Sequence, residues 1–78
     1  MRLIVYSTDG CSICEEVLDK LFALPIDFGV DLRVVDVAFD DDLLSKYGEV
    51  IPVLEANNTV LKSPFADQEM MEFIQSKV

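Results

Sequence analysis

Two cysteines separated by two residues, Cys11 and Cys14, constrain this chain more than any other feature of its sequence. They lie at the junction between an apolar run, Leu3 to Ser7, and an amphipathic segment that is predicted to be helical. Two thiols three positions apart at a helix start can form a disulfide with each other, and the helix terminus favours the thiolate. The junction therefore predicts a redox-active dithiol/disulfide pair on a strand–helix unit.

A chain of 78 residues has room for one modest core, so we expect residues 1–78 to form a single domain. Hydrophobic residues make up 51% of the chain, yet no apolar stretch is long enough to span a membrane. Six basic side chains against 15 acidic ones give a formal net charge of -9. Because binding to phosphate groups needs cations, we expect neither nucleic acid nor a membrane surface as a partner.

The apolar run at the N-terminus is too short for a signal peptide, which favours the cytoplasm as the compartment. In that reducing environment a close cysteine pair is more often catalytic or metal-binding than structural. The sequence contains no histidine, and two thiolates alone do not complete a four-ligand zinc or iron–sulfur site. We therefore expect no metal in a single chain.

The first half of the chain predicts a strand, a helix and a second strand. Leu3 to Ser7 has the continuous apolar character of a central strand. Residues 30–37 predict a second strand parallel to it, whose shifted apolar phase indicates a bulge or deeper burial. The intervening helix is expected to end at Leu24 and Pro25, before a loop over residues 25–29. Its apolar positions recur with helical period and are expected to face inward: Cys14, Val17, Leu18, Leu21 and Phe22.

The second half predicts a short helix, a hairpin and a final helix. The acidic run 40–42 is expected to cap the short helix, which Gly48 stops. Strands over 51–54 and 59–61 pair around an Asn57-Asn58 turn, because Asn tolerates positive φ. Asp67 is expected to cap the last helix, whose inward residues are Met70, Met71, Phe73 and Ile74. The predicted fold class is α/β, in the order βαβ-α-ββα, with a four-stranded mixed sheet and helices on both faces.

The positions of the two cysteines on the predicted helix suggest different chemical roles. Cys11 precedes the first helical turn, where unpaired N–H groups stabilise a thiolate. Cys14 lies one turn further on the apolar face, so it is expected to be buried and to act as the resolving thiol. Glu15 and Glu16 oppose the helix terminus, and we expect the pKa of Cys11 to fall only partly.

The motif and its surroundings resemble the thioredoxin fold, and among its members the short glutaredoxin-like proteins. The resemblance covers essentially the whole chain: the Cys pair after a first strand, Ile51-Pro52 at the start of a later strand, and a closing ββα unit. It implies that Cys11 is the nucleophile and that Cys14 resolves the mixed disulfide. It also implies that Pro52 is cis and forms the substrate platform, so that the backbone of Ile51 can pair with a bound thiol substrate as a strand would. The remaining substrate-binding residues that we carry over are Ser12, Ile13, Val50, Ile51, Phe65 and Asp67.

The resemblance implies a thiol–disulfide oxidoreductase that acts on protein or glutathione mixed disulfides and needs no bound cofactor. Glutathione or a thioredoxin-type protein would act as the reductant, and we expect a monomer. The chain lacks the family's basic residue before the motif, and residues 62–65 replace its Gly-Gly step. An acidic site is expected to repel anionic glutathione, so a protein disulfide is an open alternative.

Three other interpretations of the cysteine pair stay open at this point. The fold could be a binding module without turnover, or two chains could meet to supply four thiolates to a metal or iron–sulfur cluster. The cysteines could also be two small buried hydrophobic residues. The turn position of Cys11, directly after Gly10, disfavours burial of that side chain.

Overall fold

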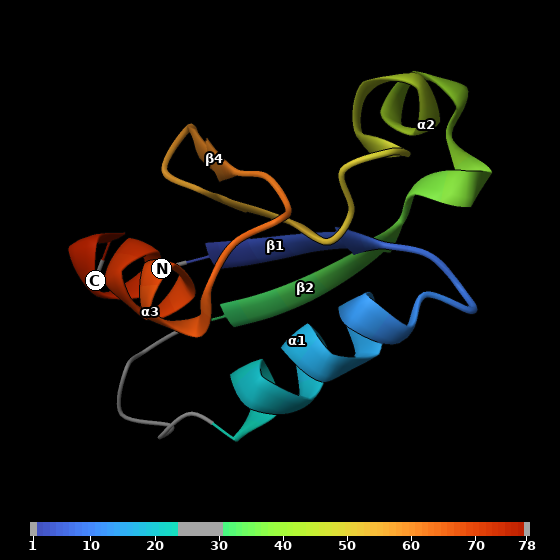
Figure 1. The fold of residues 1–78 in the computed structure, drawn as a ribbon. Helices are drawn as coiled ribbons and strands as arrows, with labels where there is room; N and C mark the ends of the chain where they lie inside the picture. The colour runs from blue at the N-terminus through green and yellow to red at the C-terminus, as the bar shows by residue number, and fades with distance from the viewer. Residues whose placement is uncertain (1, 24–30, 78) are drawn as a thin grey trace.

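The computed structural model describes residues 2–23 and 31–77, and these residues form four strands, three α-helices and one short 3₁₀ helix (Figure 1). The elements follow the order predicted from the sequence. The predicted end of the first helix at 24–25 and the loop over 25–29 lie outside the described residues. The elements are β1 (Arg2–Ser7), α1 (Ser12–Phe22), β2 (Asp31–Asp36), η2 (Val37–Phe39), α2 (Asp41–Tyr47), β3 (Val53–Ala56), β4 (Thr59–Leu61) and α3 (Asp67–Lys77).

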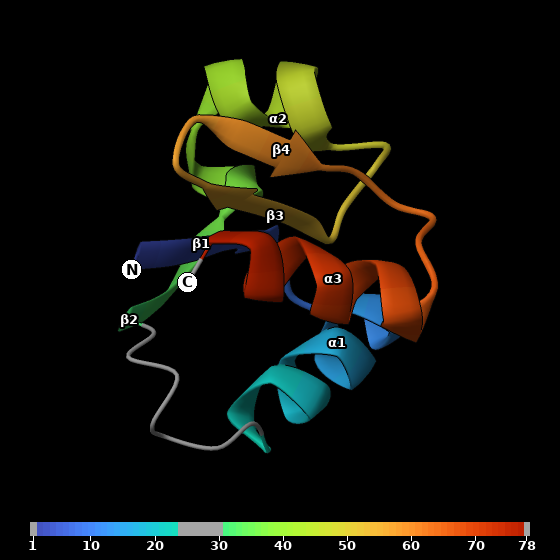
Figure 2. The ribbon, with the colours of Figure 1, turned by 90° about the vertical axis from the view of Figure 1, so that its left-hand side faces the viewer.

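The strands form one mixed sheet in the order β2-β1-β3-β4. Strand β1 pairs with β2 in parallel and with β3 antiparallel, and β3 and β4 form an antiparallel hairpin. Helices α1 and α3 lie on one side of the sheet and α2 on the other (Figure 2). The predicted mixed sheet with helices on both faces is therefore confirmed. None of the described helices is long and apolar enough to cross a membrane.

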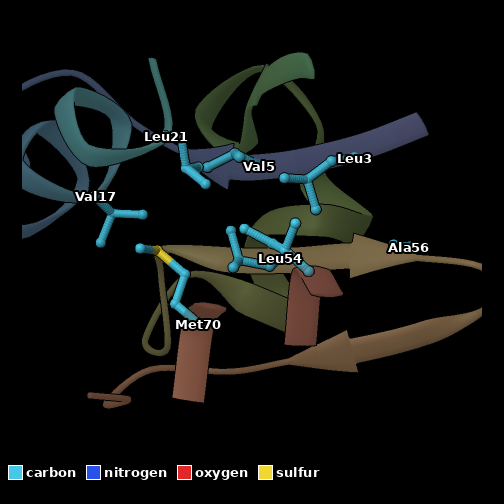
Figure 3. Close-up of a cluster of buried hydrophobic side chains, with 8 residues drawn as sticks. Leu3, Val5, Val17, Leu21, Leu54, Ala56 and Met70 are labelled. Atoms are coloured by element: carbon cyan, nitrogen blue, oxygen red, sulfur yellow. The ribbon is translucent and has the colours of Figure 1, made fainter. Parts of the chain in front are cut away.

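The larger core fills the space between the sheet and helices α1 and α3. Side chains from β1, α1, β3 and α3 gather there (Figure 3). Because side chains alternate across a strand, every second residue of β1 and β3 points into this layer. The buried members of this cluster are Leu3, Val5, Val17, Leu21, Leu54, Ala56, Met70 and Ile74.

A smaller core lies on the opposite face of the sheet, under α2. It contains Tyr6, Val37, Tyr47 and Val53, and the two tyrosine rings have centroids 4.9 Å apart. The Tyr6 hydroxyl donates a hydrogen bond of 3.1 Å to the Glu55 carboxylate. This cluster fixes the end of β1 against the beginning of β3.

Two turn and cap predictions are confirmed by the backbone. The Asp40 carboxylate accepts hydrogen bonds from the amides of Asp42 and Leu43, so it is the N-cap of α2. Asn57 and Asn58 have φ of 50° and 63°. Both lie in the left-handed region that a two-residue hairpin turn with the right twist requires.

For the second strand the sequence left a bulge or deeper burial open, and the structure has deeper burial. The paired residues of β1 and β2 run without interruption from Arg2 opposite Asp31 to Ser7 opposite Asp36, and β2 becomes more buried toward Val37. Phe22 was predicted to face inward but is 69% exposed. Each helical residue turns about 100° from the last, so Phe22 lies off the face that Leu21 buries.

Strand β3 starts later than predicted, and the last helix starts one residue earlier. Strand β3 begins at Val53 rather than Ile51, because Ile51 and Pro52 precede the paired segment. Asp67 is the first residue of α3 rather than its cap. The Ala66 amide donates to the Glu69 carboxylate at 3.0 Å, which is the reciprocal half of a capping box. Asp67 is thus left to interact with another element.

Candidate active site

Cys11 is the N-cap residue of α1. Its backbone is extended, with φ -90° and ψ 101°, and the chain reaches it through Gly10, whose φ of 79° favours glycine. The Cys14 amide donates a hydrogen bond to the Cys11 Sγ at 3.2 Å, and the Glu15 amide donates to the Cys11 carbonyl at 3.1 Å. The sulfur therefore occupies the place of a capping oxygen, where N–H groups and the helix dipole stabilise negative charge.

Cys11 and Cys14 form a disulfide, with their Cα atoms 5.2 Å apart. Cys14 is 1% exposed, whereas Cys11 is partly exposed. The inner sulfur lies one helical turn into the domain, and the outer sulfur lies at the start of α1. An incoming thiol or disulfide can therefore approach Cys11 more readily than Cys14.

The segment before β3 lies at the same end of the sheet as the disulfide. Tyr6 pairs with Val53 across the antiparallel ladder, so the next residues outward are Ser7 on one side and Pro52 on the other. Strand β1 then continues through a turn to Cys11. Figure 2 shows the starts of α1 and β3 at the same side of the molecule.

The Ile51–Pro52 peptide bond is cis, as the resemblance to the family implied. Pro52 is buried and Ile51 is partly buried against the smaller core. The main-chain N–H and C=O of Ile51 have no hydrogen-bond partner among residues 2–23 and 31–77. These two groups can form the short ladder that an extended polypeptide makes with a strand edge.

Ser63, which was not predicted as a site residue, contacts both neighbours of Ile51. Its amide donates to the Val50 carbonyl at 3.1 Å, and its hydroxyl donates to the Pro52 carbonyl at 2.7 Å. The sequence carries no local signal for these contacts, because they connect residues eleven and thirteen positions apart that only the hairpin brings together.

The remaining predicted site residues lie in different surroundings. Ser12 and Ile13 are exposed beside the disulfide, with Ile13 59% exposed. Phe65 packs against the larger core. Asp67 is exposed at the start of α3, and its carboxylate accepts a hydrogen bond of 2.7 Å from Lys20, which raises the pKa of the Lys20 ammonium group.

The charged groups next to the disulfide are acidic. Asp9, Glu15 and Glu16 are all exposed within five residues of a cysteine. In the part of the chain that the structure describes, no three Cys, Asp or Glu side chains are grouped so that they could hold a metal ion.

Comparison with known proteins gives a family match over almost the whole chain. Residues 2–77 match the family model described as a glutaredoxin-like domain (DUF836). No curated protein matches the sequence.

Several solved structures are similar to the chain, among them the following three. Protein Ne2328 from Nitrosomonas europaea has 30% identity and a TM-score of 0.73, with 92% of this chain and 87% of that chain covered. The structural genomics target XcR50 from X. campestris has 24% identity and a TM-score of 0.76, with coverage of 95% and 96%. Thioredoxin 1 from Thermosipho africanus has 21% identity and a TM-score of 0.74, with coverage of 97% and 92%. The thioredoxin-like fold expected from the sequence is confirmed.

Proposed function

Because this chain belongs to the family of glutaredoxin-like domains, we propose that it is a thiol–disulfide oxidoreductase in which Cys11 is the nucleophile and Cys14 the resolving thiol. In the reduced protein the Cys11 thiolate attacks a substrate disulfide. A mixed disulfide forms between Cys11 and one half of the substrate, and the other half leaves as a thiolate that takes up a proton. The Cys14 thiolate then attacks the Cys11 sulfur and releases the second half.

This cycle leaves the Cys11–Cys14 disulfide and transfers two electrons to the substrate, which takes up two protons as its thiols form. Two thiols of a reductant, supplied by glutathione or a thioredoxin-type protein, regenerate the dithiol by the reverse exchange. No bound cofactor takes part. A reducing compartment such as the cytoplasm supplies these thiols continuously.

The unequal burial of the two cysteines is the observation that carries the proposal. Cys11 is partly exposed at the helix N-cap, and its Sγ accepts a hydrogen bond from the Cys14 amide. Cys14 is only 1% exposed. A helix N-terminus favours the thiolate form of a cysteine at this position, and the thiolate is the attacking species. The buried sulfur can reach only its neighbour, which suits a resolving thiol.

The main-chain groups of Ile51 supply the substrate side of the site. Their lack of partners among the described residues supports a role in pairing with an extended segment on one side of the substrate disulfide. The acidic side chains Asp9, Glu15 and Glu16 disfavour an anionic substrate such as glutathione. We therefore favour a protein disulfide as the substrate.

The roles of the two cysteines can be separated by reduction of insulin and of a glutathione mixed disulfide. Cys11→Ser is expected to abolish turnover, whereas Cys14→Ser should accumulate a mixed disulfide detectable by mass spectrometry. Ser45→Ala, an exposed change on α2, serves as the matched control with unchanged turnover. Equal residual activity in both cysteine variants would contradict the assignment.

Two further measurements test the proposal against its alternatives. A reduction potential of the Cys11/Cys14 pair near the cytosolic glutathione poise supports redox turnover, whereas a much lower potential indicates an inert disulfide. A dimer that contains zinc or iron and dissociates on chelation would instead support the cluster carrier.

A further inference from the structure

Ser63, which follows the β3–β4 hairpin, forms hydrogen bonds to the loop before β3 through both its main-chain amide and its hydroxyl. The Ser63 amide binds the Val50 carbonyl at 3.1 Å, and the Ser63 hydroxyl binds the Pro52 carbonyl at 2.7 Å. Ser63 is partly buried, so water competes less for these bonds than it would at the surface. Residues on both sides of Ile51 are thereby attached to one point of the fold.

In the loop before β3, the main-chain groups of Val50 and Pro52 form hydrogen bonds within the protein, whereas those of Ile51 bond to none of the described residues. The Val50 amide donates to the Tyr47 carbonyl at 2.9 Å, so both main-chain groups of Val50 are used within the protein. Pro52 has no N–H, and its carbonyl accepts the Ser63 hydroxyl. Ile51 therefore lies between two residues with occupied main-chain groups, while its own groups lack partners in the described part of the chain.

We propose that Ser63 is a positioning residue, which holds the Val50 and Pro52 carbonyls so that the Ile51 main chain is fixed and open for an extended substrate. The inference rests on the proposed function. Ser63 acts through the loop before β3 and not on the sulfurs. Its effect is to remove the freedom of the loop before the substrate arrives, which reduces the entropy lost on binding.

This role predicts a dependence on substrate size. A polypeptide disulfide can pair with Ile51 through its backbone, whereas bis(hydroxyethyl) disulfide has no peptide groups to pair. Ser63→Ala removes the hydroxyl and releases the Pro52 carbonyl. We expect KM for insulin to rise about fivefold, the loss typical of one hydrogen bond, with kcat retained. Reduction of bis(hydroxyethyl) disulfide and the reduction potential of the cysteine pair should stay unchanged.

Two variants separate positioning from a general effect on the fold. Ser63→Thr keeps a hydroxyl and is expected to restore KM for insulin to within about twofold of the wild type. Ser45→Ala controls for the loss of a serine hydroxyl at an exposed site. An unchanged KM for insulin in Ser63→Ala, or an equal loss on both substrates, would overturn the inference.

A second measurement does not depend on turnover or on the stability of Ser63→Ala. In Cys14→Ser, a peptide carrying one cysteine can be attached to Cys11 as a mixed disulfide. The Ile51 amide should exchange more slowly with deuterium in this complex than in the free protein. Unchanged exchange on attachment would overturn the inference even if the wild type reduces insulin, whereas a wild type that reduces neither substrate would overturn the proposed function instead.

Discussion

The hydrogen bond between Tyr6 and Glu55 makes a specific prediction about stability at alkaline pH. Tyr6 is 8% exposed, and its hydroxyl donates to the Glu55 carboxylate at 3.1 Å. Burial first, and then the hydrogen bond and the negative charge of Glu55, raise the pKa of Tyr6 from 10.0 to about 12. The contact joins Tyr6, near the end of β1, to Glu55 in β3, three residues after Pro52, so it supports the end of the sheet that carries the disulfide.

The folded protein holds the Tyr6 proton more tightly than the unfolded chain does, so loss of this proton at alkaline pH lowers the free energy of unfolding. Below about pH 10 the phenol is protonated in both states, and its stabilising contribution is complete. Above that pH the unfolded chain releases the proton first, and stability falls by about 1.4 kcal/mol per pH unit until the folded pKa near 12. The cumulative loss is about 1.4 kcal/mol at about pH 11 and about 2 kcal/mol at about pH 12.

Tyr6→Phe removes both the hydrogen bond and the titration. At neutral pH the variant should be less stable by about 1.5 kcal/mol, the lower end for a bond to a charged acceptor, since Glu55 is only partly buried. The stability curves of variant and wild type should therefore cross near about pH 11. Urea unfolding of the oxidised proteins, followed by circular dichroism between neutral and alkaline pH, measures both curves.

The comparison between the two proteins cancels the titration of groups that they share. Tyr47 stays in both and lies beside Tyr6 in the same cluster, so ring packing is largely conserved. A difference between wild type and Tyr6→Phe that stays constant across the alkaline range would refute the argument. It would mean that Tyr6 has the same pKa in the folded and unfolded chains.

Two further predictions concern the core and the helix caps. Met70→Ala should lower the free energy of unfolding by about 2–5 kcal/mol, since Met70 is 2% exposed. Phe22→Ala, at a 69% exposed position, should change it by less than about 0.5 kcal/mol. Denaturant unfolding of both variants measures the difference, and similar losses in the two would contradict the prediction. Asp40→Ala should cost about 1 kcal/mol because the carboxylate caps α2 through the amides of Asp42 and Leu43. Asp40→Asn keeps an acceptor and is the control, and an equal loss in both variants would show that charge rather than capping stabilises the helix.

Most of the secondary structure could be predicted because its determinants are local. The apolar run of β1, the helical spacing from Cys14 to Leu21, the Asp40 cap and the Asn57-Asn58 turn each act within a few residues. The prediction that Phe22 faces inward was wrong. Helical periodicity identifies the apolar side of a helix, but it does not show where the elements that cover this side end.

The cysteine pair, its place at a strand–helix junction and the acidic residues beside it in the chain follow from local sequence alone. The other residues around that pair depend on long-range contacts. The register of Tyr6 with Val53 brings Pro52 to the end of β1. Lys20 donates a hydrogen bond to the carboxylate of Asp67. Ser63 donates hydrogen bonds to the carbonyls on both sides of Ile51. These contacts join residues far apart in the chain, and their partners are set by strand order and register, which no local pattern of side chains encodes.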